Sequence, residues 1–127
     1  MAREPGARSA ESLTRAERLR KRPDFLRCYR KGRRRPGALA ILYSAPNDLG
    51  HPRLGLTVSK KVGGAVLRVR LKRRIREIYR RWSQRGQLPA LDLVVHVKPP
   101  MARASFDQIR DELLRLLRAS MTSREAS

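Results

Sequence analysis

The residues best suited to chemistry in this sequence are the basic side chains near its middle. Lysines come first and arginines then recur with helical spacing; the set is Lys60, Lys61, Arg68, Arg70, Lys72, Arg73, Arg76 and Arg80. A guanidinium group grips phosphate through two parallel hydrogen bonds and stacks on nucleobases. Like charges four residues apart on a helix cost roughly 0.2–0.5 kcal/mol per pair. The pattern therefore predicts that an external polyanion supplies the counter-charge.

Carboxylates, histidines and the single cysteine form no catalytic pattern. Metal-dependent phosphodiester hydrolysis needs clustered carboxylates, whereas the acidic residues lie singly in separate segments, as Asp24, Asp48, Glu77, Asp92 and Asp107 do. His51 and His96 have no partner pattern, and Cys28 alone can form no internal disulfide. We predict no catalytic residue and no metal site in this chain.

Three aromatic residues offer a second kind of chemistry. Phe25 and Tyr29 lie four residues apart in a helical segment, and Tyr43 lies in a predicted strand. Together they could stack single-stranded nucleotides, each stack contributing roughly 1–3 kcal/mol, or they could simply fill a core. For Phe25 the two interpretations are balanced, whereas the phenolic oxygens of Tyr29 and Tyr43 favour a site open to water.

Length and charge limit the classes of protein. The chain has 127 residues, 31 Lys and Arg against 11 Asp and Glu, and a formal net charge of +20. This length allows one modest core and argues against a large multidomain enzyme. The charge favours nucleic acid, an anionic membrane or an acidic protein as partner. No apolar stretch is long enough for a membrane span or a secretion signal, so we expect a cytoplasmic protein.

The elements that must position these residues follow from periodicity. We predict a single domain at 13–120 between flexible tails at 1–12 and 121–127. Its predicted elements are a short helix from Pro23 to Gly32, strands over 38–44 and 53–60 joined as a hairpin, a long helix after Gly64, a strand over 92–98, and a last helix opened by Ser105 and Gln108. This order indicates an α+β domain of the split βαβ type.

The long helix carries the strongest periodic signal in the chain. Rotation by ~100° per residue places five apolar residues within about an 80° arc; they are Leu67, Leu71, Ile75, Ile78 and Trp82. Most of the remaining surface is cationic, and Glu77 is the only acidic residue on it. One face is therefore predicted to cover a sheet and the other to meet the polyanion.

The stretch LGLTVSKKVGGAVLRVRLKRRIREIYRR, residues 54–81, resembles the signature of the protein subunit of bacterial ribonuclease P. A looser similarity extends over residues 19–118. The resemblance implies a small mixed sheet of about four strands with three helices and a left-handed βαβ crossover, as in domain 2 of ribosomal protein S5, with a short extra strand near 33–38. It also implies a subunit that binds the catalytic RNA and helps to remove 5′ leaders from precursor tRNA, with magnesium held by the RNA and no cofactor or small-molecule substrate of its own.

Residue by residue, the resemblance implies two contact surfaces. The RNA-facing helix corresponds to Arg68, Arg70, Lys72, Arg73 and Arg76, preceded by Lys60 and Lys61. The cleft for the single-stranded leader corresponds to Phe25, Tyr29 and Tyr43, with Ser59 near its rim. Val69 and Gly64 stand where the family has asparagine.

Two other classes remain open at this point. A structural RNA-binding protein, such as a ribosomal component, would have the same size and charge. An anionic-membrane binder could use the basic amphipathic helix, although its apolar stripe is better suited to covering a sheet.

Overall fold

A four-stranded mixed sheet forms the centre of the computed structural model, which describes residues 13–121. The predicted tail at 1–12 lies outside them, and so does the predicted tail at 121–127 except for Met121, which belongs to the last helix. The strands are β1 (Arg33–Pro36), β2 (Ala40–Pro46), β3 (Arg53–Thr57) and β4 (Leu91–Val97). Their order across the sheet is β1-β2-β4-β3, with β3 and β4 parallel and the other two pairs antiparallel. The α+β class, the mixed sheet and the short extra strand are confirmed.

The predicted hairpin between 38–44 and 53–60 is wrong. β4 lies between β2 and β3 and pairs with both. All but one of its residues are buried, since both of its faces are covered by helices. Such a nearly continuous apolar strand favours the middle of a sheet, and it separates two strands that a short turn would otherwise join.

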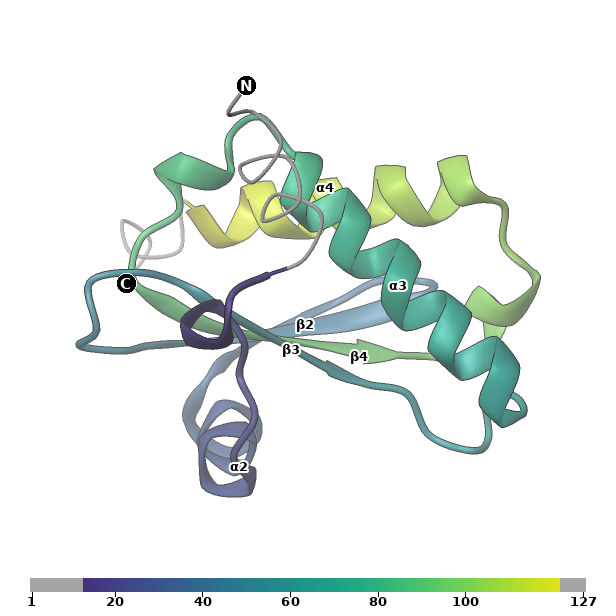
Figure 1. The fold of residues 1–127 in the computed structure, drawn as a ribbon, viewed down its shortest axis with the longest axis horizontal. Coiled ribbons are helices and arrows are strands. Elements are labelled where there is room, and N and C mark those ends of the chain that lie inside the picture. The colour runs from purple at the N-terminus through teal and green to yellow at the C-terminus, as the bar shows by residue number, and fades with distance from the viewer. Residues whose placement is uncertain (1–12, 122–127) are drawn as a thin grey trace.

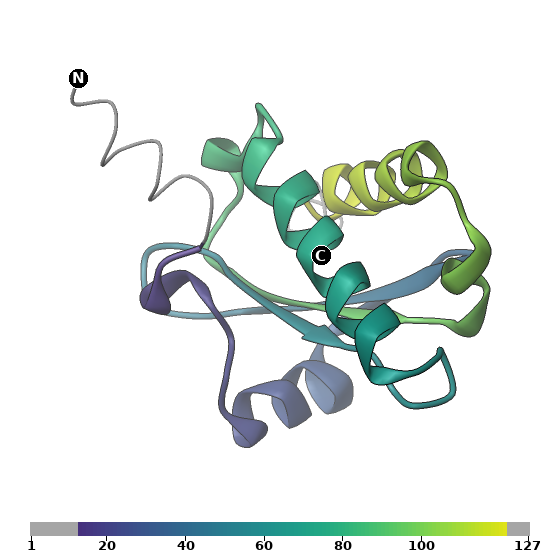
Figure 2. The same ribbon diagram turned by 45° about the vertical axis from the view of Figure 1, so that its right-hand side comes forward.

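Helices cover both faces of the sheet, as Figure 1 shows. On one face lies α2 (Arg22–Lys31), and on the other lie α3 (Ala65–Arg81) and α4 (Phe106–Met121). Figure 2 shows α3 and α4 running beside each other over that second face. Within residues 13–121 there are also three short 3₁₀ helices: η1 (Arg15–Glu17), η2 (Arg85–Gln87) and η3 (Pro99–Arg103).

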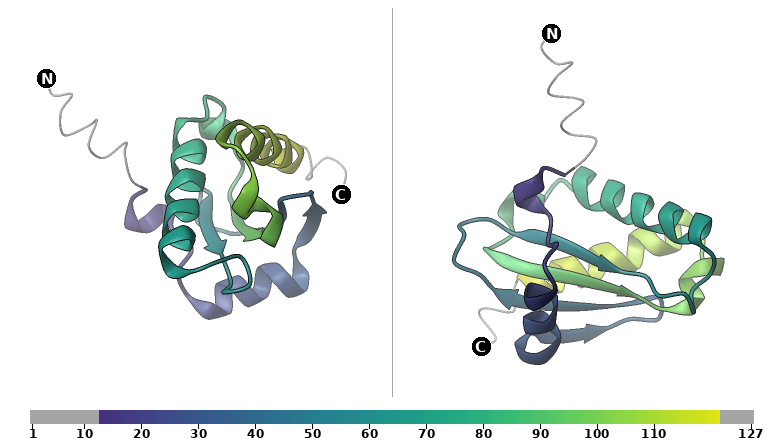
Figure 3. Two further views of the ribbon diagram at one scale, coloured as in Figure 1. Left: turned by 90° about the vertical axis from the view of Figure 1, so that its right-hand side faces the viewer. Right: turned by 60° about the horizontal axis from the view of Figure 1, so that its bottom comes forward.

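The β3–α3–β4 connection has the less common hand. Both strands run the same way, and α3 lies above them in Figure 1, while the right-hand view of Figure 3 shows β4 between β3 and β2. Seen along the strands from their N-terminal ends, the chain passes counterclockwise from β3 over the helix to β4. The crossover is therefore left-handed, as the resemblance implied and against the usual rule.

The main core lies between the sheet and the α3–α4 layer. The apolar stripe of α3 enters it through Leu71, Ile75 and Ile78, and Trp82 closes the helix as a buried residue. The predicted cap of α4 is present, because Ser105 N donates to Gln108 Oε1 at 2.8 Å and Gln108 N donates to Ser105 Oγ at 3.1 Å. Burial of these stripes fixes which side of α3 remains outside.

A carboxylate of α4 fastens the turn between β1 and β2. Glu112 accepts hydrogen bonds from the backbone N–H groups of Ala38, Leu39 and Ala40 at 2.7–2.9 Å. Gly37 lies close beside it, since a Cβ there would be 2.5 Å from Glu112 Oε2 and 3.0 Å from Ala40 O. The far edge of the sheet is thereby tied to the last helix.

Candidate nucleic-acid interface

The outer side of α3 carries the predicted RNA-binding residues. We call this surface the cationic face; its residues are Arg68, Arg70, Lys72, Arg73, Arg76 and Arg80. Arg70 and Arg73 are exposed, and the other four are half-buried. The structure thus places six of the eight predicted residues on one helix, outside its apolar stripe.

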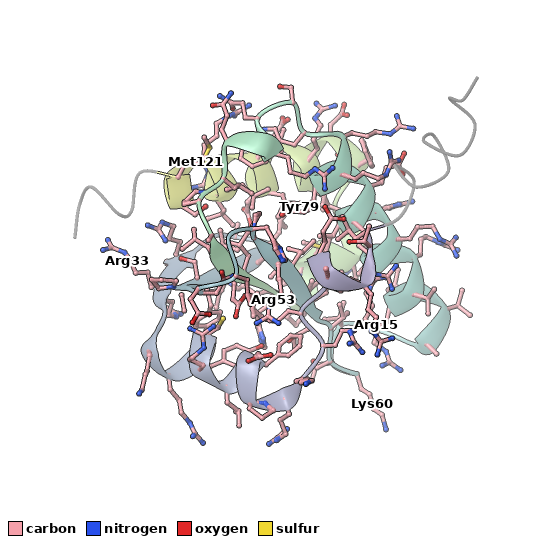
Figure 4. All side chains as sticks on the ribbon, turned by 60° about the vertical axis from the view of Figure 1, so that its left-hand side comes forward. Arg15, Arg33, Arg53, Lys60, Tyr79 and Met121 are labelled. Atoms are coloured by element: carbon pink, nitrogen blue, oxygen red, sulfur yellow. The ribbon has the colours of Figure 1, made fainter. Side chains whose placement is uncertain are left out.

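The loop before α3 directs two more cations outward. Val58 and Val62 are buried in the main core, and Val62 N donates to Ser59 O at 3.1 Å to close a turn. Lys60 and Lys61 lie between these two anchors and are exposed. Figure 4 shows Lys60 extending away from the body of the protein. The turn therefore presents both lysines beside the start of the helix.

The N-terminus of α3 has no anionic partner of its own. Gly64 is the N-cap residue and gives no side-chain hydrogen bond, and the first turn contains no acidic residue. The free N–H groups and the helix dipole favour an anion at this end. A Cβ at Gly64 would meet nothing within 4 Å, so space alone does not require glycine here.

Ion pairs to the cationic face are absent among the described residues. The ion pair between two residues of α3 joins Arg81 Nη2 to Glu77 Oε2 at 3.4 Å, and neither residue belongs to the cationic face. Arg68 donates from Nε to the backbone oxygen of Gly63 at 3.1 Å, which orients it without neutralising it. Between residues 13 and 121, no ion pair neutralises a member of this face.

Val69 lies within this surface and outside the core. Its side chain is 55% exposed, and Val66 beside it is 75% exposed. Rotation by about 100° per residue places Val69 away from the apolar stripe of α3, and the structure agrees. Nothing in the structure explains why valine stands there.

The three predicted aromatics meet on the opposite face of the sheet, under α2. We call Phe25, Tyr29 and Tyr43 the aromatic cluster; all three are half-buried and pack against the same small core. The rings of Tyr29 and Tyr43 are 4.7 Å apart between centroids and cross at 72°. Ser59 lies on the exposed turn beyond β3, two residues after Thr57.

Phe25 lies on the backbone of the neighbouring strand. A Cβ at Gly55 would be 2.6 Å from Phe25 Cζ, so the ring occupies the space that any larger residue would need. Gly55 is itself buried. This contact resembles core packing, and it brings α2 close to the sheet.

Two residues that sequence reasoning left out complete the aromatic cluster. Tyr29 Oη lies 2.8 Å from Thr57 Oγ1, to which it donates, and 3.1 Å from His96 Nδ1. Burial lowers the pKa of His96 and raises the pKa of Tyr29, so both groups are neutral at pH 7. The available signal was strand alternation, since the register puts Thr57 opposite His96 and Tyr43 opposite Val94 on one face.

A buried carboxylate holds α2 in this position. Asp92 is fully buried in β4, and its oxygens accept hydrogen bonds from Arg27 of α2, from Arg53 Nε of β3 at 2.8 Å and from Asn47 Nδ2 at 2.9 Å. Burial alone would raise the pKa of Asp92, but the hydrogen bonds from Arg53 and Asn47 outweigh it and keep that pKa below its ordinary value. Figure 4 shows Arg53 in this region, between β3 and α2. The sequence places Asp92 alone, and the fold surrounds it with partners.

Metal-ligating and nucleophilic groups are sparse in the part of the chain that the structure describes. It contains no group of three His, Cys, Asp or Glu residues able to hold a metal ion. Cys28 is buried, and burial raises the pKa of its thiol to about 11. None of the described helices has the length and apolar character needed to cross a membrane.

Comparisons with known proteins agree with this geometry. The family model described as Ribonuclease P matches residues 13–120. The ribonuclease P protein component of Alkaliphilus metalliredigens is 39% identical over 101 residues, covering 79% of this chain and 89% of the relative. That of Thermotoga maritima is 38% identical over 113 residues, covering 85% and 95%.

Solved structures show the same relationship. The RNase P protein of Staphylococcus aureus superposes with a TM-score of 0.76 at 34% identity, covering 84% of this chain and 96% of that one. The RNase P protein of Thermotoga maritima gives a TM-score of 0.71 at 36% identity, covering 80% and 94%. These matches do not favour the alternative of a ribosomal component. The chain belongs to the family of bacterial ribonuclease P protein components.

Proposed function

We propose that the cationic face of α3, together with Lys60 and Lys61, binds the catalytic RNA of ribonuclease P. The observation that carries this proposal is the lack of counter-charge on that face among the described residues. A polyanion would relieve the repulsion between neighbouring guanidinium groups and satisfy the free N-terminus of α3. Phosphates of RNA supply that charge, and RNA is the partner that family membership implies.

The aromatic cluster on the other face is proposed to contact the single-stranded 5′ leader of precursor tRNA. Tyr43 is half-buried and therefore partly accessible, and bases stack on aromatic rings without strict sequence preference. Ser59, on the exposed turn beyond β3, is proposed to lie at the rim of this contact. The cluster and the cationic face lie on opposite sides of the sheet, which would let one subunit contact two RNA strands.

Hydrolysis itself is assigned to the RNA partner. In this proposal magnesium is held by RNA, and the protein contributes affinity and substrate discrimination within a cytoplasmic ribonucleoprotein. The described groups at the two surfaces are cations, neutral aromatic rings, a neutral imidazole and, beside the cationic face, the single carboxylate of Glu77. None of them forms the carboxylate cluster that a two-metal nuclease site uses.

Reconstitution at low magnesium tests the proposal. The full-length chain is added to ribonuclease P RNA and precursor tRNA, and cleavage at the tRNA 5′ end is measured. We expect restored cleavage, and RNA affinity that falls about a thousandfold between 50 and 200 mM salt if six phosphates are neutralised. No cleavage, or affinity independent of salt, would refute the proposal.

Variants of the two surfaces should separate their roles. Arg68→Ala with Arg70→Ala should weaken assembly with the RNA. Tyr43→Ala should reduce discrimination of precursor over mature tRNA and leave assembly largely intact. A matched control is Arg110→Ala, because Arg110 lies on α4 and pairs with Asp107 and Asp111 at 3.4 and 3.2 Å. Equal losses for the control and the α3 variants would contradict a specific face.

A further inference from the structure

A hollow lies between the N-terminal segment and the outer side of α3. Its volume is about 480 Å³, which is enough for a phosphate group and its attached riboses. The residues that line it are Arg18, Val69, Arg73, Arg76, Glu77, Arg80 and Arg81. All but Arg18 come from α3, so the hollow exists only because a second segment lies beside the helix, as the left-hand view of Figure 3 shows for the segment around η1.

The backbone around Arg18 is fixed by several independent contacts. Leu13 and Leu19 on either side are buried, and Leu19 N donates to Leu54 O of β3 at 2.9 Å. Thr14 and Glu17 form a reciprocal capping box on η1. Arg18 itself donates from Nε to Leu13 O at 3.2 Å. That bond sets the direction of the side chain and leaves the two terminal nitrogens of the guanidinium available to a ligand.

The groups that line the hollow lack acceptors. Five arginines face one glutamate, and that glutamate, Glu77, already pairs with Arg81. The Nε atom of Arg80 is buried without a hydrogen-bond partner among the described residues. Burial, and next the nearby charge of Arg18, lower the pKa of Arg76. Guanidinium groups are thus held together at an energetic cost that an anion would remove.

We propose that this hollow is a binding site for a backbone phosphate of RNA, with Arg18 on one wall and Arg76 and Arg80 on the other. The inference rests on the proposed function for the identity of its partner. Arg18 lies outside α3 and outside the residues that the signature motif singles out, so the site extends the RNA contact onto the N-terminal segment. Val69 adds an apolar side chain to the lining of the hollow.

Salt dependence of RNA binding gives a direct count of phosphates. Each lost phosphate contact lowers the slope of log affinity against log salt by about 0.7–0.9. We expect that decrease for Arg18→Ala and for Arg76→Ala separately. The double variant should show nearly the same decrease as either single one, because the two side chains hold the same phosphate. Arg20→Ala is the matched control, since Arg20 is exposed in the same segment and does not line the hollow.

A small probe tests the site in the absence of RNA. Inorganic pyrophosphate should raise the melting temperature of the wild-type protein and of Arg20→Ala. It should raise that of the Arg18→Ala, Arg76→Ala double variant much less. Arg76→Ala keeps the Leu13 and Thr14 contacts of the N-terminal segment, so it reports on the site even if Arg18→Ala disturbs that segment.

The outcomes distinguish failure of the phosphate site from failure of the proposed function. Unchanged salt slopes in both single variants, or additive decreases in the double variant, would overturn the phosphate site and leave the proposed function intact. Protection by pyrophosphate without any change in the RNA slope would also overturn it, because the anion would then bind where RNA does not. Failure of the wild-type protein to bind ribonuclease P RNA would refute the proposed function itself.

Discussion

Two groups of arginines lie on opposite sides of the sheet, and they differ in whether a carboxylate of the protein pairs with them. Under α2, Arg27 and Arg53 converge on Asp92, a fully buried carboxylate. On the outer side of α3, the cationic face makes no ion pair among the described residues, and its neighbour Glu77 pairs with Arg81 instead. The first group is neutralised within the fold and serves to hold α2. The second makes no ion pair within the described residues, which is the condition that the proposed RNA contact requires.

The largest expected effect lies on the neutralised side. Asp92→Ala leaves Arg27 and Arg53 without their buried partner, and breaking such a pair costs about 3–5 kcal/mol. Urea or thermal unfolding monitored by circular dichroism measures this loss. Asp111→Ala is the control, since that carboxylate is 72% exposed and its pair with Arg110 is worth less than about 1 kcal/mol. Similar losses for both variants would mean that the Asp92 cluster is not a structural anchor.

The contact between α2 and β3 gives the next largest effect. Gly55→Ala puts a Cβ at 2.6 Å from Phe25 Cζ, and overpacking of this kind costs about 1–3 kcal/mol. We expect reduced stability and, because Phe25 belongs to the aromatic cluster, weaker discrimination of precursor tRNA. Gly86→Ala is the control, because a Cβ there meets nothing within 4 Å. Adding Phe25→Leu should restore part of the lost stability, and no recovery would argue against this clash.

A smaller effect concerns pH and the aromatic cluster. Burial lowers the pKa of His96 below 6.5, so the unfolded chain binds its proton first as the pH falls. His96 therefore contributes stability that is complete above about pH 6.5 and is lost toward its lower folded pKa, with a slope of at most about 1.4 kcal/mol per pH unit. Unfolding measured between pH 7.5 and 5 should depend less on pH in His96→Gln. An equal or steeper dependence in the variant would contradict this assignment.

Local patterns in the sequence predicted most elements and the cationic face. Periodicity placed the stripe of α3, and the capping residues Ser105 and Gln108 placed the start of α4. Local patterns could not predict how the strands pair. The pairing depends on which strand can be buried on both faces, and the apolar β4 lies in the middle of the sheet for that reason. The hand of the crossover came from the resemblance and not from periodicity.

Site residues, too, could be predicted where local spacing fixes their position and could not where strand pairing does. Arg70 and Arg73 could be predicted because a helix fixes which residues share a face. Thr57 and His96 could not, since their contact with Tyr29 depends on a register between strands far apart in sequence. The Asp92 cluster was missed for the same reason, although a single aspartate in an apolar strand is a signal that partners must surround it.

The smallest effect on stability is the sharpest test of the difference between the paired and the unpaired arginines. The free energy of unfolding should rise here, whereas it should fall in Asp92→Ala. Arg70 is exposed, and its neighbours three and four residues later on α3 are Arg73 and Arg74. Arg70→Ala removes two like-charge pairs, so the free energy of unfolding should rise by a few tenths of a kcal/mol, as measured by urea unfolding at low salt. The same variant should lower the salt slope of RNA binding by about 0.7–0.9. Both results together would show that Arg70 serves RNA binding at a small cost in stability. A loss of stability in Arg70→Ala would instead show that the two groups of arginines differ less than their ion pairs indicate.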